Sequence, residues 1–302
     1  MALSAGTRLG PSAMGATRRL IAWIGAAFIV GLIRTFGRRV RESAAPWLSG
    51  PIGSDYIGDT PYEEVAAREN LELIRRSPSG GLLPDVGALD GSGFRVSELR
   101  PEVRHFYEHT AAYRMDVWSA SFFPSKIGLW LLVTTLSRTV NQLNFPLHAL
   151  ATAKGIDSEI VLLKDRTGAV RYAGWYRQLV DIGRTLYTGF YMVERVPLCD
   201  TPCVKVVFPM PRGNATVILR PSIDERGHLR LSSRGARFGD AGFYRVLKTA
   251  EDRLLVWRVS TLHEEFRVYV DDQNVVRCDH AVSFWGMPVL HLHYRIERMR
   301  EA

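Results

Sequence analysis

Apolar and polar side chains alternate with a period of two through residues 266–298, which read FRVYVDDQNVVRCDHAVSFWGMPVLHLHYRIER. The clearest part is the last segment, where two sets of residues alternate: Leu290, Leu292, Tyr294 and Ile296 against Val289, His291, His293 and Arg295. Successive side chains of a strand point to opposite faces, so this pattern predicts strands with one buried face. Asp272-Gln273-Asn274 and Trp285-Gly286-Met287-Pro288 supply the turns between them.

The same pattern extends back to Glu159, with turn signals every eight to twelve residues. We expect strands near 159–164, 169–180, 184–196, 203–208, 214–220, 228–234, 253–261, 266–271, 275–284 and 288–298. About ten strands exceed what an open twisted sheet usually holds. The sequence therefore predicts a large, mostly antiparallel sheet that is barrel-like or forms two layers.

Helices are expected before this sheet. Thr60-Pro61-Tyr62-Glu63 is a capping box with proline in the first turn, and its helix should run to about Arg76. A second helix should begin between Ser97 and Pro101 and continue to about Ser119, and a third should cover 125–143. We favour a core position for the third helix over a second membrane contact.

The predicted class is therefore α+β, with N-terminal helices followed by the sheet. We divide the chain into a basic apolar N-terminal helix (1–42), a linker (43–59), a helical layer (60–145) and an antiparallel barrel-like domain (155–298) packed with that layer. The linker is expected from its proline and glycine content.

The positive charge of the chain is concentrated at its N-terminus. The net charge is +8, but seven of the 39 basic residues precede the first acidic residue, Glu42, which leaves 32 basic against 31 acidic residues. A nucleic-acid-binding domain carries its basic excess on the fold itself, because phosphate neutralisation drives its affinity. The near-neutral remainder argues against nucleic acid as a partner.

Residues 20–33 form an apolar run between Arg19 and Arg34. As a helix the run spans roughly 21 Å, short of the hydrocarbon core of about 30 Å. Membrane association through a single N-terminal anchor or an interfacial helix is the favoured interpretation, and a removed presequence or a helix buried against the domain are the alternatives.

Standard catalytic motifs are missing from the sequence. It has no G-x-S-x-G elbow, no Walker loop and no G-x-G-x-x-G after a strand. Three cysteines, Cys199, Cys203 and Cys278, do not suit a disulfide scaffold. The C-x-x-x-C pair Cys199 and Cys203 is a weak metal or redox signal, and two ordinary thiols near a turn are the favoured interpretation.

An H-x-x-E-H motif at residues 105–109 is the sharpest candidate for chemistry. On a helix, His105 and His109 lie one turn apart and are candidate zinc ligands, with Glu108 as the general base of a hydrolase. No third ligand is evident, and a solvated helix face is the simpler interpretation.

A second candidate site is the last hairpin. If Trp285 faces Pro288, His280 lies opposite His293, and the third imidazole, His291, lies nearby. With Arg295 these residues would bind an anion, a metal or a headgroup, although a register shift of one residue would disperse them. His263 and Glu264, with Glu265, form a third candidate at a junction between strands.

These observations favour binding of a lipid or another apolar molecule near a membrane, because an aromatic-rich barrel offers an apolar cavity. A metal-dependent hydrolase and a membrane-proximal interaction protein remain alternatives. The sequence leaves open whether the chain catalyses a reaction, and it identifies no cofactor.

Overall fold

The computed structural model describes residues 27, 30–54, 57–122, 142, 156–180 and 185–299. Strands make up 51% of the structure and the helices are few, which confirms the predicted antiparallel sheet. The strands of the C-terminal half are β4 (Ile156–Lys164), β5 (Val170–Leu179), β6 (Thr185–Glu194), β7 (Cys203–Met210), β8 (Gly213–Ile223), β9 (Leu229–Ser232), β10 (Gly242–Ala250), β11 (Arg253–Arg258), β12 (Leu262–Val270), β13 (Val276–Phe284) and β14 (Met287–Arg298).

Three strands come from the first 121 residues, among short helices. The strands are β1 (Arg38–Arg41), β2 (Glu72–Arg75) and β3 (Tyr113–Ser121). The helices are α2 (Thr60–Glu69) and α3 (Pro101–Glu108), with 3-10 turns η2 (Pro46–Leu48), η3 (Val86–Leu89), η4 (Val96–Glu98) and η5 (Thr110–Ala112).

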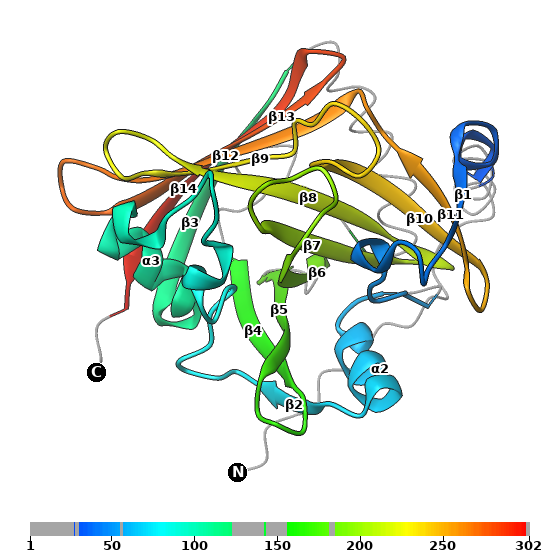
Figure 1. Cartoon of the computed structure of the whole chain (residues 1–302). Helices are drawn as coiled ribbons and strands as arrows, with labels where there is room; N and C mark the ends of the chain where they lie inside the picture. The colour runs from blue at the N-terminus through cyan, green and yellow to red at the C-terminus, as the bar shows by residue number, and fades with distance from the viewer. Residues whose placement is uncertain are drawn as a thin grey trace.

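All fourteen strands belong to one sheet, whose main path runs β2-β4-β5-β6-β7-β8-β9-β12-β13-β14-β3 (Figure 1). The path branches at β8, because residues up to Ile218 pair with β10 and residues from Arg220 pair with β9. β10 pairs in turn with β11, and β11 with β1. Every named pairing is antiparallel.

The sheet does not close into a barrel, so that part of the prediction is wrong. Its path ends at β2 and β3, and these two described strands do not pair. The physical reason is that the concave face is filled by α3 and the turns before it. Their apolar side chains cover inward-facing residues that a closed barrel would bury against one another.

The second predicted helix is wrong beyond Glu108, because Tyr113–Ser121 forms β3 and pairs with β14 along its whole length. Tyr113, Met115 and Val117 alternate with polar residues, so the segment is compatible with a strand as well as with a helix. It forms a strand because it pairs with the otherwise free edge of β14. The first helix ends at Glu69, since Asn70 has a left-handed backbone (φ 54°) and Glu72–Arg75 joins the sheet as β2. The predicted strands all have counterparts, β10 was missed, and helix 125–143 lies outside the described residues.

The N-terminal segment is described only in part. Residues 30–36 are helical and lead into β1, with Ile33 buried and Phe36 exposed. Most of the apolar run 20–33 lies outside the described residues. Within them, no helix combines the length and apolar character needed to cross a bilayer.

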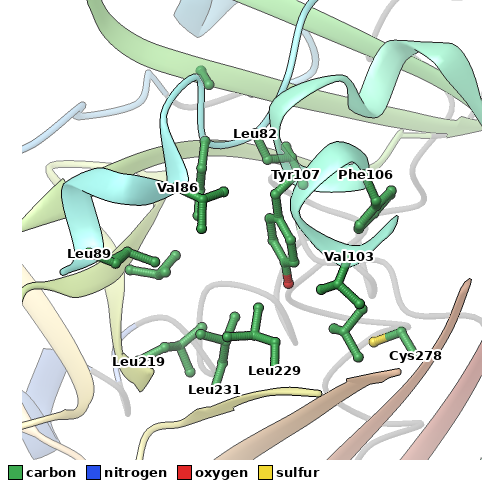
Figure 2. Close-up of a cluster of buried hydrophobic side chains, with 14 of the residues drawn as sticks. Leu82, Val86, Leu89, Val103, Phe106, Tyr107, Leu219, Leu229, Leu231 and Cys278 are labelled. Carbon is green, nitrogen blue, oxygen red and sulfur yellow. The ribbon is translucent and has the colours of Figure 1, made fainter. Parts of the chain in front are cut away.

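The main core lies on the concave face of the sheet. Figure 2 shows Leu82, Val86 and Leu89 of the turn segment and Val103 and Phe106 of α3 above strand residues such as Leu229 and Leu231. Tyr107 points its hydroxyl from α3 toward these strands (Figure 2). The cluster includes inward residues of strands from β4 to β14, so the sheet curls around the segment 82–107.

Two smaller clusters cover the convex face. Tyr62 and Val65 of α2 pack on Val161, Phe190 and neighbours from β4 to β7. Trp47 and Leu48 of η2 pack against β7, β8, β10 and β11, and Trp47 contacts Tyr244 edge-on at a centroid distance of 5.2 Å.

In the α2 cluster, the ring of Tyr62, which is 0% exposed, lies directly against Gly174 of β5. A Cβ on Gly174 would lie 2.4 Å from Cε1 of Tyr62. We expect Gly174→Ala to lower the free energy of unfolding by about 1–3 kcal/mol, because the ring must move within a closed cluster. Urea denaturation measures the change. Gly93→Ala is the control, because nothing lies within 4 Å of its added Cβ. Equal effects of the two substitutions would contradict the packing of Tyr62 on β5.

Candidate functional site

The H-x-x-E-H motif spans the end of α3. The imidazoles of His105 and His109 are neighbours, with ring centroids 4.6 Å apart, but His109 caps the helix with φ −135°. His105 Nδ1 lies 2.8 Å from the hydroxyl of Tyr113. Glu108 accepts hydrogen bonds from Val86 N at 3.1 Å and Arg104 Nε at 3.0 Å. In the part of the chain that is described, no three His, Cys, Asp or Glu side chains form a group suited to a metal ion.

The register predicted for the last hairpin is wrong by one residue. Phe284 pairs with Met287 across a two-residue turn, and an irregularity between Val282 and Ser283 shifts the remaining pairs. His280 therefore lies opposite Leu292, whereas His293 lies opposite Asp279. Since adjacent positions face opposite ways, the shift separates His280 from the other two imidazoles.

The predicted ligand-binding residues are thus divided between the two faces. On the convex face, His293 Nδ1 lies 2.7 Å and His291 Nε2 3.7 Å from the same Asp279 oxygen. Arg295 pairs there with Glu297. His263 alternates with Glu264 along β12, and its Nδ1 is buried without a hydrogen-bond partner among the described residues.

On the concave face, His280 and Glu264 are together. His280 Nε2 lies 3.3 Å from a Glu264 carboxylate oxygen, although the pair is not aligned as a hydrogen bond. The imidazole stacks on Phe266, with centroids 3.9 Å apart and planes 15° apart. Of the residues predicted to bind a ligand in the hairpin and at the β12 junction, these two face the core.

Arg177 of β5 is the most unusual residue of this face. Its side chain is 2% exposed and lies between three aromatic rings, at 5.0 Å from Trp175, 5.6 Å from Tyr294 and 5.9 Å from Tyr187. Tyr294 belongs to β14, far from β5 in the sheet order, so the curl of the sheet brings the two ends together. Arg177 forms no ion pair with a carboxylate of the described residues. Its side chain hydrogen-bonds with the phenols of Tyr187 and Tyr294, while its Nε and Nη2 are buried without a hydrogen bond.

Two other cations of the interior, the buried Lys205 and the partly buried Arg245, differ from Arg177. Lys205 donates to Ser49 O at 2.6 Å and pairs with Glu194 at 3.2 Å. Arg245 donates to three backbone carbonyls, those of Asn214, Val246 and Pro211. Burial lowers the pKa of Arg245 to about 10. Both are thus satisfied within the fold, as buried polar groups normally are.

Tyrosines surround the guanidinium and influence its charge. Burial alone lowers the pKa of Arg177, but the phenols of Tyr187 and Tyr294 outweigh burial and raise it, so the group stays charged. Burial also raises the pKa of Tyr294 to about 12, and a side-chain hydrogen bond links Tyr187 to Tyr191. Both phenols, Tyr187 and Tyr294, therefore stay protonated at neutral pH, and their oxygens accept hydrogen bonds from Arg177.

An open pocket of about 290 Å³ lies at the end of β12, β13 and β14. Its walls include Phe122, Val282 and Leu290, together with the charged or titratable Arg234, His263, Glu264, Glu265 and His291. Leu290 also belongs to a small apolar cluster with Val117, Leu292 and Tyr294. That cluster joins the pocket to the ring of Tyr294 against which Arg177 lies.

Sequence reasoning missed Arg177, although one signal was present. Arg177 lies two residues after Trp175 and two before Leu179, so it occupies the apolar face of a strand. Tyrosines from β6 and β14 lie beside Arg177 because of how the strands pair and how the sheet curls. The local alternation of apolar and polar residues contains no information about either.

No family model, curated protein or solved structure matches this chain.

The two histidines His105 and His263 should make stability depend on pH. Burial lowers both pKa values, assisted by the charges of His109 and Arg298 for the first and of Arg234 and Arg258 for the second. In the unfolded chain a histidine has its ordinary pKa near 6.5, so the unfolded state takes up protons first as pH falls. We expect the free energy of unfolding to fall from pH 7 to pH 5, and His105→Gln with His263→Gln to reduce that slope. Denaturant titrations at several pH values test this, and an unchanged slope in the double variant contradicts it.

Proposed function

We propose that this protein binds an anionic amphipathic molecule, of the long-chain carboxylate class, with its charged head at Arg177. Binding rather than catalysis is the activity proposed. The observation that supports it is the buried guanidinium of Arg177, whose Nε and Nη2 have no hydrogen-bond partner among the described residues.

Burying the charged guanidinium of Arg177 costs free energy. An unpaired ion in a protein interior costs several kcal/mol even after relaxation. Cation–π contacts recover only about 0.5–2 kcal/mol each. An apolar side chain at this position would avoid that cost. A bound anion would offset it, because the anion pairs with the guanidinium in the ligand-bound state.

The chemistry of the ligand follows from which nitrogens are free. Nε and Nη2 form one edge of a guanidinium, and this edge binds a carboxylate with two parallel hydrogen bonds. Arg75 does so in this protein, since its Nε and Nη2 donate to the two oxygens of Glu159 at 3.0 and 3.1 Å. The same two nitrogens of Arg177 have no hydrogen-bond partner among the described residues, so they are available to the two oxygens of a carboxylate head.

The apolar part of the ligand is expected toward the pocket. From Tyr294, the apolar side chains of Val117, Leu292 and Leu290 lead to the pocket wall at Val282 and Phe122. A volume of about 290 Å³ is at the lower end of the range for small-molecule sites. The ligand therefore needs some rearrangement of side chains between pocket and guanidinium.

We also propose that the pocket end of the sheet contacts a membrane. Trp285 is 70% and Met287 47% exposed at the tip of the β13–β14 hairpin, whose Gly286 and Pro288 line the pocket together with Phe122. Tryptophan favours the bilayer interface, and Arg234 in the pocket wall suits anionic headgroups. An amphipathic ligand would then enter directly from the lipid.

The metal-dependent hydrolase has weaker support. Glu108 is engaged by Val86 N and Arg104, and His105 by Tyr113. No observation favours it over binding.

Replacing Arg177 should separate binding from stability. We expect Arg177→Met to weaken binding of a long-chain fatty acid about 10- to 100-fold, the loss of a charge-assisted hydrogen-bonded pair. The free energy of unfolding without ligand should stay equal or rise, because an unpaired buried charge is removed. Titration calorimetry and urea denaturation measure the two effects.

Three controls accompany this experiment. A fatty alcohol of equal length should bind Arg177→Met and wild type alike. Arg177→Lys keeps the charge but loses the two-pronged edge, so its affinity should be intermediate. Arg245→Met should lose stability, because three carbonyls lose their donor, and its folded fraction should keep fatty-acid affinity. Fatty-acid binding that is unchanged by Arg177→Met would overturn the proposal.

The membrane contact has its own test. We expect Trp285→Asn with Met287→Thr to reduce flotation with phosphatidylcholine–phosphatidylglycerol vesicles several-fold, because two apolar side chains at the interface are lost. Asn tolerates the positive φ of 49° at position 285. Trp118→Thr is the control, since Trp118 is 49% exposed on β3, away from the tip. The N-terminal segment is present in every variant, so equal flotation of all three proteins counts against the tip.

A further inference from the structure

A pair of thiols lies at the start of β7, remote in sequence from the residues used above. Cys203 is the first residue of β7, and Cys199 precedes it in a turn with Asp200, Thr201 and Pro202 between them. Cys203 is fully buried, whereas Cys199 is partly exposed. Both are free thiols.

Three groups converge on the sulfur of Cys199. The Cys203 thiol makes a side-chain hydrogen bond with it. Arg220 Nη2 lies 3.6 Å away, and Asp240 Oδ1 lies 3.4 Å away. The partly exposed sulfur therefore has a second thiol and a guanidinium as immediate neighbours.

Asp240 holds the guanidinium in position. Its Oδ1 lies 2.5 Å from Arg220 Nη2, and its two oxygens accept hydrogen bonds from Ala241 N at 2.7 Å and Ala236 N at 2.8 Å. Burial raises the pKa of Asp240, but these backbone donors and Arg220 outweigh it and lower the pKa. The carboxylate is thus charged and fixed, and it orients Arg220 against the sulfur of Cys199.

We propose that Cys199 and Cys203 form a peroxide-sensitive dithiol that closes to an intramolecular disulfide. The Cys199 thiolate attacks one oxygen of hydrogen peroxide, the O–O bond breaks, and the departing hydroxide takes up a proton to give water. Cys199 is then a sulfenic acid. The Cys203 sulfur attacks it, the S–O bond breaks, and the hydroxyl leaves as a second water with the Cys203 proton. Two thiols lose two electrons and two protons in all, and one peroxide is reduced to two waters.

The ionisation of the two thiols suits these roles. The hydrogen bond from Cys203, followed by the Arg220 guanidinium, outweighs burial and lowers the pKa of Cys199 to about 7. The pKa of Cys203 is raised, chiefly by the same hydrogen bond and by burial. Cys199 is therefore the attacking thiolate and Cys203 the resolving thiol. The Cys203 thiol also lies 3.6 Å from Thr201 O within the same turn, so the two sulfurs must approach each other to reach the S–S distance of about 2.05 Å.

Cys278 supplies a control within the same molecule. It lies in the concave core, and burial raises its pKa. It has no second thiol beside it among the described residues, so it stays reduced under conditions that oxidise Cys199.

The test uses the reduced full-length protein, hydrogen peroxide and tryptic peptides. Cys199 and Cys203 lie on one peptide, residues 196–205, because Arg195 and Lys205 flank it. This peptide should lose the mass of two hydrogens after peroxide treatment and regain it with dithiothreitol. In Cys203→Ser, Cys199 should form an adduct with dimedone, the trap for sulfenic acid. In Cys199→Ser, residue 203 should remain a thiol.

Arg220 variants test the electrostatic part. Arg220→Gln should slow alkylation of Cys199 by iodoacetamide at pH 7 several-fold, and Arg220→Lys should retain most of the rate. Far-ultraviolet circular dichroism checks that both variants fold. The proposal is overturned if wild-type Cys199 is oxidised to sulfinic acid as readily as in Cys203→Ser, or if Cys278 reacts at the rate of Cys199.

Discussion

The contact between the concave face of the sheet and the segment 82–107 is the interaction on which the other features depend. Leu82, Val86, Val103 and Phe106 fill this face, and strands from β4 to β14 contribute to the same cluster (Figure 2). Burial of apolar surface is the dominant favourable term in folding. Here it favours a sheet that wraps around a helix over a sheet that closes into a barrel. The curl that results sets Tyr294 of β14 against Arg177 of β5.

The buried cations of this fold differ in the partners that compensate their charge. Lys205 and Arg245 receive carbonyl or carboxylate partners, so their burial is compensated within the chain. Arg177 receives aromatic faces and leaves one hydrogen-bonding edge free. Arg220 of β8 is partly exposed and lies against the sulfur of Cys199. In both proposals an arginine is positioned by the fold beside a group or a space whose chemistry it can alter.

Much of the fold could be predicted from local patterns, and the errors have a common cause. The alternation from Glu159 onward located all ten expected strands, and Thr60-Pro61 located the start of α2. The predicted capping box itself is wrong, because Asp59 is the N-cap and no side-chain capping hydrogen bond forms. β3 was taken for a helix because Val117 and Trp118 also suit helical spacing, and the unpaired edge of β14 settled the matter. The imidazole cluster failed because a bulge between Val282 and Ser283 shifted the register by one residue. The choice of pairing partner and the position of a bulge are tertiary properties. A register shift of one residue moves each side chain to the opposite face of the sheet relative to its cross-strand neighbours.

The sequence by itself determined the antiparallel strands, most of their turns and the separation of a basic N-terminus from a near-neutral body, because periodicity, turn chemistry and charge are local properties of the chain. Only the tertiary structure decided that the sheet stays open, that His280 and Glu264 face the core while His291 and His293 face outward, and that Arg177 lies among Trp175, Tyr187 and Tyr294. Those outcomes depend on which distant strands pair and on how far the sheet curls around α3, and both are set by the packing of residues far apart in the chain.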